Sequence, residues 1–379
     1  MARRFSLPEP LAESFSVELP TIGHHISLTH YAPDVLRYAE PVILCHGLGA
    51  NRFNMDFLDD GQGEGRLSLS RSLAELGFDT WVLELRGRGR ATVIAGADWS
   101  VDDQVSEDVP TAIETVLDLT GADGVFWVGH SKGALLQVLF QARAHALASR
   151  VRGLVAIAGP GLFRARWLRW LLASLTPFFR RRSVPVARLA RLFLPVSGLV
   201  AAFGRWLYAD LGNLEAQTLR RLLASLPANI APGVLAQFDH WVRQGHLTVS
   251  RADTREVAYQ EITLPTLFIS GSRDLLAPPE SVAHIAGEIA SSDVTVRTIG
   301  RAFGHSSDYG HGDLVLGRDA PTEIFPEIHR WLVAHARPIA SGSSPAPDPA
   351  PAPDSDPAPD SAPAPAPAPA LDSDPAPRS

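Results

Sequence analysis

Cysteine is almost absent from this 379-residue chain, which contains only Cys45. A single cysteine excludes any disulfide within the chain, and this fits a reducing compartment, so we expect a cytoplasmic protein. The chain also lacks a run of about 18 apolar residues, which a membrane-spanning helix needs. Arg3 and Arg4 are not followed by the apolar stretch of a secretory signal, so none is expected.

A strong charge imbalance is also missing from most of the chain. The net charge is −7, but residues 341–379 contain six Asp and one Arg and so account for −5 of it. The remainder is close to neutral, and net charge therefore gives no reason to expect a nucleic-acid partner.

Large apolar residues are scarce after Pro338, where Pro, Ala, Asp and Ser dominate. Such a segment cannot bury enough apolar surface to offset the entropy of ordering. We therefore expect residues 339–379 to form a disordered, solubilising tail.

Apolar runs typical of buried strands alternate with helical patterns over most of the remaining chain. The expected strands cover 41–45, 80–85, 125–128, 151–158, 266–270 and 294–299, and an antiparallel hairpin covers 14–19 and 24–31. Helices are expected at 66–76, 101–119 with a kink at Pro110, after 133, at 278–290 and at 321–336. This alternation predicts an α/β fold with a mostly parallel sheet between helices.

The strand rhythm stops between residues 162 and 261. This stretch is helix-like, rich in Arg, Leu and Trp, and is divided by several prolines. We interpret it as a helical cap inserted above the carboxyl edge of the sheet. The expected domains are a core of 1–161 and 262–338, a cap of 162–261 and the tail.

A Gly-x-Ser-x-Gly pentapeptide, residues 129–133, lies between an expected strand and an expected helix. A strand–serine–helix turn of this kind is a nucleophile elbow, which presents Ser131 above the sheet beside the first amides of the helix. A serine nucleophile needs a histidine base, which in turn needs an acid to orient it.

Candidates for both partners follow later strands, in the order expected for this fold. Asp274 follows the strand at 266–270, although it is also placed to cap the next helix. The strand at 151–158 offers no alternative, because no Asp or Glu occurs between Gly159 and Ala209. His305 and His311 both follow the last strand, and spacing does not choose between them.

Four stretches together resemble the α/β-hydrolase family, and in particular the lipase and esterase branch that includes the acid lipases. They are His46-Gly47-Leu48-Gly49, the elbow at Ser131, Asp274 after its strand, and Tyr309-Gly310-His311-Gly312-Asp313-Leu314. The resemblance implies that His311 is the base, with His305 as the fallback. It also implies an oxyanion hole formed by the backbone amides of Leu48 and Lys132. We expect the Lys132 side chain to point to solvent, the alternative being a charge that favours anionic substrates.

The expected function is that of a serine hydrolase that cleaves carboxylic esters with an apolar acyl group through an acyl-enzyme. The alternatives are an acyltransferase with the same three residues and a non-catalytic binding protein on a hydrolase fold. No metal or organic cofactor is implied. Dehalogenase and epoxide hydrolase chemistry need a carboxylate nucleophile, which Ser131 does not supply.

The cap carries an unusual charge pattern, because the nine arginines between Gly159 and Ala209 have no acid among them. Trp167, Trp170 and Leu171 share one side of an expected helix. Such a cap would wall an acyl pocket and present a basic outer face to a lipid interface. The alternative is an apolar stripe that faces the core, with the arginines in solvent.

Overall fold

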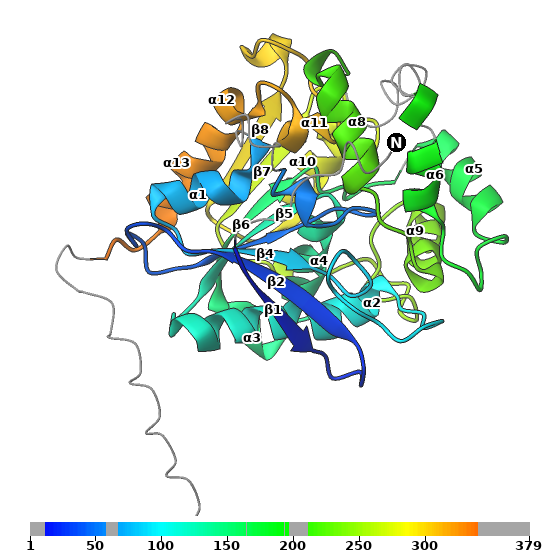
Figure 1. Cartoon of the computed structure of the whole chain (residues 1–379), viewed down its shortest axis with the longest axis horizontal. Coiled ribbons are helices and arrows are strands. Elements are labelled where there is room, and N and C mark those ends of the chain that lie inside the picture. The colour runs from blue at the N-terminus through cyan, green and yellow to red at the C-terminus, as the bar shows by residue number, and fades with distance from the viewer. Residues whose placement is uncertain (1–11, 58–66, 164, 193, 197–210, 340–379) are drawn as a thin grey trace, which may run out of the picture. The chain divides into compact units, whose positions relative to one another are not determined.

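The computed structural model describes residues 12–57, 67–163, 165–192, 194–196 and 211–339 (Figure 1). Its centre is one eight-stranded sheet in the order β1-β2-β4-β3-β5-β6-β7-β8. The strands are β1 (Glu13–Glu18), β2 (His25–Tyr31), β3 (Val42–Cys45), β4 (Thr80–Glu84), β5 (Val125–His130), β6 (Val151–Ile157), β7 (Thr266–Gly271) and β8 (Val294–Ile299). Strand β2 is antiparallel to β1 and β4, and all other neighbours are parallel, which confirms the predicted mostly parallel sheet.

Strands β3, β4 and β5 form the centre of the sheet, and all their residues are buried. Helices cover both faces there, and this explains why these strands read as continuous apolar runs. Strand β3 pairs with both neighbours, so that Cys45 lies opposite Leu83 on one side and Gly129 on the other. This register brings the loop after β3 and the turn after β5 to the same edge of the sheet.

The helices follow the predicted pattern. They are α1 (Leu69–Leu76), α2 (Val101–Asp103), α3 (Val109–Thr120), α4 (Lys132–Ala142), α5 (Arg166–Leu175), α6 (Val186–Leu192), α8 (Ala216–Ser225), α9 (Pro232–Gln244), α10 (Pro279–Glu288), α11 (Asp313–Leu316), α12 (Ala320–Glu323) and α13 (Phe325–His335). Helices α1 and α13 contact each other on one face of the sheet, and α3 and α4 cover the other (Figure 1).

Three helix boundaries differ from the prediction for local reasons. Helix α1 begins at Leu69 and not at 66, because the Ser68 hydroxyl accepts a hydrogen bond from the Arg71 amide and caps it. The helix expected at 101–119 is interrupted by a π-helical turn, η4 (Gln104–Asp108), after which Pro110 sits in the first turn of α3. The last helix is divided into α12 and α13 at Ile324.

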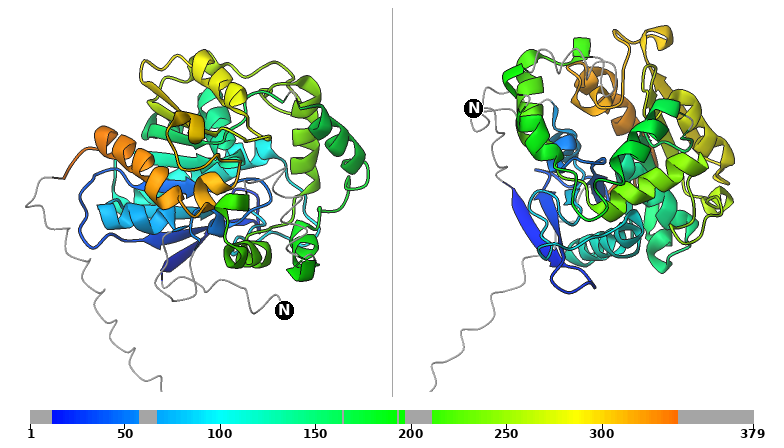
Figure 2. Two further views of the ribbon diagram at one scale, coloured as in Figure 1. Left: turned by 90° about the horizontal axis from the view of Figure 1, so that it is seen from above. Right: turned by 90° about the vertical axis from the view of Figure 1, so that its right-hand side faces the viewer.

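The described part of the segment between β6 and β7 consists mainly of helices joined by loops, with α5 and α9 in contact and α6 packed against α8. Its helices α5, α6 and α9 lie to the right of the strands in Figure 1 and therefore face the viewer in the right-hand view of Figure 2. We call residues 162–261 the inserted segment; its limits as a domain remain a prediction. The predicted tail, residues 339–379, lies outside the described residues except for Ile339. Among the described helices, none has the length and apolar character to cross a membrane.

Candidate active site

The turn between β5 and α4 holds Ser131 in a strained backbone conformation, with φ 53° and ψ −116°. Few residues other than glycine adopt a positive φ, and strain of this kind is kept where function needs it. Close packing explains both flanking glycines. A Cβ atom on Gly129 would lie 2.4 Å from the Ala134 nitrogen, and one on Gly133 would lie 2.3 Å from the Cys45 oxygen. The elbow predicted from the pentapeptide is therefore present as a tight strand–turn–helix.

Asp274 and His311 meet in the loops that follow β7 and β8. The Nδ1–H of His311 donates to Oδ2 of Asp274 at 2.8 Å, and both side chains are buried. The other carboxylate oxygen accepts from the amides of Leu276 and Ala277, each at 2.8 Å. Asp274 thus holds its own loop and orients the imidazole, but it does not cap α10, which has no side-chain hydrogen bond at its N-cap, Pro278, so the helix-capping alternative was wrong.

The charge of Asp274 is stabilised despite its burial. Burial by itself would raise the pKa of this carboxyl, but the neighbouring His311 and the two amide donors outweigh burial and lower it. The group is therefore an anion at neutral pH, as an acid that orients a histidine must be.

His311 also lies against the elbow. The Nε2–H of His130, the residue before Ser131, donates to the His311 carbonyl oxygen at 2.9 Å, and the two rings are 4.9 Å apart. His305, in contrast, is half-buried and folds back on its own loop, where Nδ1 lies 3.2 Å from the Gly300 oxygen. Of the two candidate histidines, the structure brings His311 and not His305 to Asp274.

The loop after β3 runs beside the nucleophile elbow. A Cβ atom on Gly47 would lie 3.3 Å from Cβ of Ser131. Leu48, whose amide is a predicted oxyanion donor, is the next residue of this loop. Lys132 supplies the other predicted donor, and as the first residue of α4 it carries an N–H that a helix leaves without an intrahelical acceptor.

The side chain of Lys132 does not point to solvent, so this expectation was wrong. It is completely buried, and Nζ donates to Oε1 of Gln104 in the π-helical turn at 2.8 Å. Burial lowers the pKa of Lys132 to about 7, and the positive charge of Arg88 acts in the same direction. A buried ammonium group cannot contact an anionic substrate, and the alternative of a charge that favours such substrates stays a prediction.

Two asparagines that sequence reasoning missed hold the loops of the site. Oδ1 of Asn54 lies 2.9 Å from both the Gly47 amide, which donates to it, and Nδ1 of His130. Nδ2 of the buried Asn213, from the inserted segment, donates to the Asp308 carbonyl and to Oδ2 of Asp313, both at 2.7 Å. No local sequence pattern marks either residue. Asn54 contacts one residue that precedes it and another that follows much later in the chain, and Asn213 contacts a loop about a hundred residues later.

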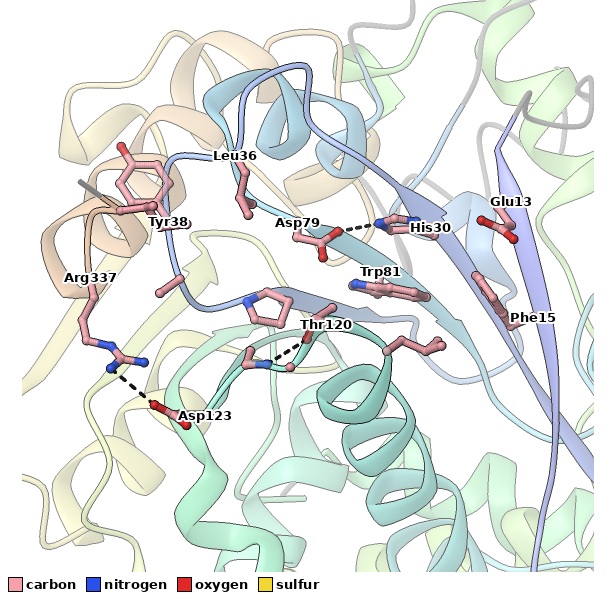
Figure 3. Close-up of a pocket in the computed structure, with 16 residues that line it drawn as sticks. Glu13, Phe15, His30, Leu36, Tyr38, Asp79, Trp81, Thr120, Asp123 and Arg337 are labelled. Carbon is pink, nitrogen blue, oxygen red and sulfur yellow. Dashed lines mark hydrogen bonds and ion pairs between the residues drawn. The ribbon is translucent and has the colours of Figure 1, made fainter. Parts of the chain in front are cut away.

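A separate cleft of about 550 Å³ opens at the other end of the parallel strands (Figure 3). Pro41, which precedes β3, and Asp123, which precedes β5, line it together with the stacked rings of His30 and Trp81. None of Ser131, Asp274 and His311 lines this cleft. The candidate active site and this cleft thus occupy opposite edges of the sheet.

The alpha/beta hydrolase fold family matches residues 40–314 of the chain. This match spans the elbow and both partner loops, and the chain therefore belongs to the α/β-hydrolase family. Human lipase member K is similar to the chain, with 24% identity over 301 residues that cover 69% of this chain and 72% of the lipase. Mouse gastric triacylglycerol lipase is 22% identical over 69% of this chain and 73% of its own length. A solved thermophilic esterase from Thermogutta terrifontis, with malate bound, has a TM-score of 0.57 and 18% identity over 86% of this chain and all of that one, which shows a shared fold.

Proposed function

We propose that this protein is a serine hydrolase that cleaves carboxylic esters with an apolar acyl group through an acyl-enzyme. The observation that carries the proposal is the buried His311–Asp274 pair next to a serine held at positive φ. The names of the related lipases support an ester or lipid substrate of small size.

In the proposed reaction, Ser131 attacks the ester carbonyl while His311 removes its proton. The Nδ1–H bond to Asp274 leaves Nε2 of His311 as the basic nitrogen, and the carboxylate stabilises the imidazolium that forms. The oxyanion of the tetrahedral intermediate accepts hydrogen bonds from the amides of Leu48 and Lys132. His311 then returns the proton to the leaving alcohol, and water activated by the same histidine hydrolyses the acyl-enzyme.

The inserted segment, residues 162–261, serves in this proposal as a cap that walls the acyl pocket. Two hydrogen bonds to the loop after β3 support this role. The Ala228 amide donates to the Gly49 oxygen at 2.8 Å, and Nδ2 of Asn51 donates to the Ser225 oxygen at 2.7 Å. The segment is therefore attached directly beside Leu48. In this proposal the acyl chain of a bound ester extends from the reacting carbon toward this part of the cap.

The proposal is tested with Ser131→Ala and nitrophenyl esters of increasing acyl length. We expect kcat to fall by about 10³ or more, because only binding and the oxyanion donors remain. The matched control is Ser149→Ala, at an exposed serine, which should retain wild-type activity. Full activity in Ser131→Ala, with the fold intact by circular dichroism, would refute the mechanism. Transfer of the acyl group to added glycerol in preference to water would instead identify an acyltransferase.

A further inference from the structure

We propose that residues 166–192, which comprise α5, the following turn and α6, bind the surface of an anionic lipid membrane. This goes beyond the proposed hydrolysis, because it names a surface that is separate from the candidate active site. We call these residues the 166–192 surface. Two independent features carry the proposal: large apolar side chains exposed to solvent, and arginines that have no acidic partner among the residues that the structure describes.

Helix α5 exposes the indole ring of Trp170 on the side that faces solvent. Leu168 and Leu172 pack against the core, and the helix contacts α9. The opposite side carries Arg166, Arg169 and Trp170, all exposed and spaced as neighbours on a helix surface. Trp170 is 72% exposed. The core-facing alternative for this tryptophan is therefore wrong, and a tryptophan between arginines is typical of a side chain that enters a lipid interface.

The same pattern continues beyond α5. Phe179 packs against the core, whereas its neighbour Phe178 is 81% exposed. On α6, Leu192 is 70% exposed and Leu189 is 45% exposed. Single exposed apolar residues are ordinary on protein surfaces. Here four large ones are concentrated in one stretch of chain, at the right-hand edge of the molecule in Figure 1.

The second feature of the 166–192 surface is the exposure of its arginines. All seven are exposed, namely Arg166, Arg169, Arg180, Arg181, Arg182, Arg188 and Arg191. None of them forms an ion pair with a residue that the structure describes. Among the described residues, Arg169 and Arg191 donate to backbone carbonyl oxygens, those of Arg243 and Ala224. A cluster of unpaired guanidinium groups is attracted to the negative surface potential of anionic lipids.

A depression of about 630 Å³ adjoins the three consecutive arginines, Arg180 to Arg182. Ile94, on its rim, is 55% exposed and adds a further apolar side chain. Asp98 also lines the depression, but its Oδ1 accepts hydrogen bonds from the amides of Trp99 and Gly233. The depression therefore gives a lipid phosphate a place beside three guanidinium groups.

A membrane fits this combination better than an acidic protein or a nucleic acid. A nucleic acid would be held by the arginines and could stack bases on Trp170 and Phe178, but it would gain little from the exposed aliphatic side chains of Leu189 and Leu192. A polar, acidic protein surface would gain little from any of the four apolar side chains. A bilayer interface accommodates both kinds of side chain, because the apolar side chains enter the acyl boundary while the arginines bind the headgroups.

The test measures binding of the full chain to vesicles of ether-linked phosphatidylcholine, with and without about one third ether-linked phosphatidylglycerol. Ether lipids have no ester to hydrolyse, so binding is measured apart from catalysis. We expect binding only to the anionic vesicles, weakened by high salt. Replacing Arg180, Arg181 and Arg182 together by Glu should weaken binding by about 100-fold or more. Trp170→Ser and Phe178→Ser should each weaken it by about 10-fold.

Two matched controls separate the surface from general effects. Val35→Ser removes an apolar residue that is 61% exposed and lies between β2 and β3, outside the 166–192 surface and the adjoining depression. A second control replaces the exposed Arg152, Arg301 and Arg330 by Glu. It changes the net charge as much as replacing the three consecutive arginines of the 166–192 surface does. Both controls should bind anionic vesicles as the wild type does. All variants should hydrolyse soluble nitrophenyl butyrate normally, so that loss of membrane binding and loss of the proposed hydrolysis are told apart.

Three results would overturn the proposal. They are equal binding to neutral and anionic vesicles, an equal loss in the charge-matched control, and a loss in the arginine variant with none in Trp170→Ser or Phe178→Ser. The last result would assign the arginines to an acidic macromolecule.

Discussion

At the scale of single residues, two histidines of one loop have very different surroundings. His311 donates to a buried carboxylate, whereas Nδ1 of the half-buried His305 lies near the Gly300 oxygen of its own loop. We therefore predict that His311→Ala lowers kcat for nitrophenyl esters by about 10³ or more, because Ser131 loses its base. His305→Ala is the internal control and should stay within about threefold of wild type. A larger loss in His305→Ala than in His311→Ala would reverse the assignment of the base.

Lys132 is a second residue whose surroundings decide its chemistry. Its ammonium group is buried beside Gln104, with Arg88, Cys45 and Asp108 as its charged or titratable neighbours. The pKa in the folded protein is about 7, well below the ordinary value for lysine. Between these two values the unfolded chain binds more protons than the folded chain, so the free energy of unfolding rises with pH.

This difference predicts a pH-dependent stability that Lys132→Met removes. From pH 7 to pH 10 the free energy of unfolding of the wild type should rise by about 2 to 4 kcal/mol more than that of the variant. Urea unfolding at several pH values measures both. Burial raises the pKa of Asp108 to about 6, so its titration falls below this window and does not obscure the effect. Parallel pH profiles for the two proteins would show that Lys132 does not carry a shifted pKa.

At the scale of elements, the inserted segment is fastened to the histidine loop through Asn213. Its amide nitrogen bridges Asp308 and Asp313, and Oδ1 of Asp313 in turn accepts from the Gly310 amide at 2.9 Å. These contacts bracket His311 on both sides. Asn213 thus acts through the loop as a positioning residue for the proposed base.

We predict that Asn213→Ala lowers kcat by about tenfold and leaves KM within about twofold, since the loop orients the base and does not bind the ester. The pH profile of kcat should shift with the altered surroundings of His311. Asn229→Ala, at an exposed asparagine of the same segment, is the control. A variant that loses stability but keeps both kcat and its pH profile would reduce Asn213 to a structural role.

At the scale of the whole molecule, the features predicted from sequence are those that local patterns encode. Buried strands, the glycines around Ser131 and the loop positions of Asp274 and His311 each depend on neighbouring residues in the chain or on strand order. The fold follows from these. The choice between His305 and His311 needed the resemblance, because both occupy the same loop.

What the sequence did not predict depends on contacts between distant segments. Lys132 is buried because Gln104 and the π-helical turn pack over it, and no local pattern distinguishes this from a solvent-facing lysine. Asn213 acts on residues about a hundred positions later in the chain. Trp170 was expected to share a side with Trp167 and Leu171, but helical spacing alone does not state which side of α5 faces the core.

The attachment of the inserted segment at Gly49 and at Asn213 has a consequence for how substrate enters. A cap that made no hydrogen bonds to the loops of the site could move away without disturbing them. Here the same movement would break the Ala228–Gly49 bond and release the Asp308–Asp313 loop. In the proposed mechanism, an ester that could enter only through such a movement would react after the segment has returned and His311 is again held in place.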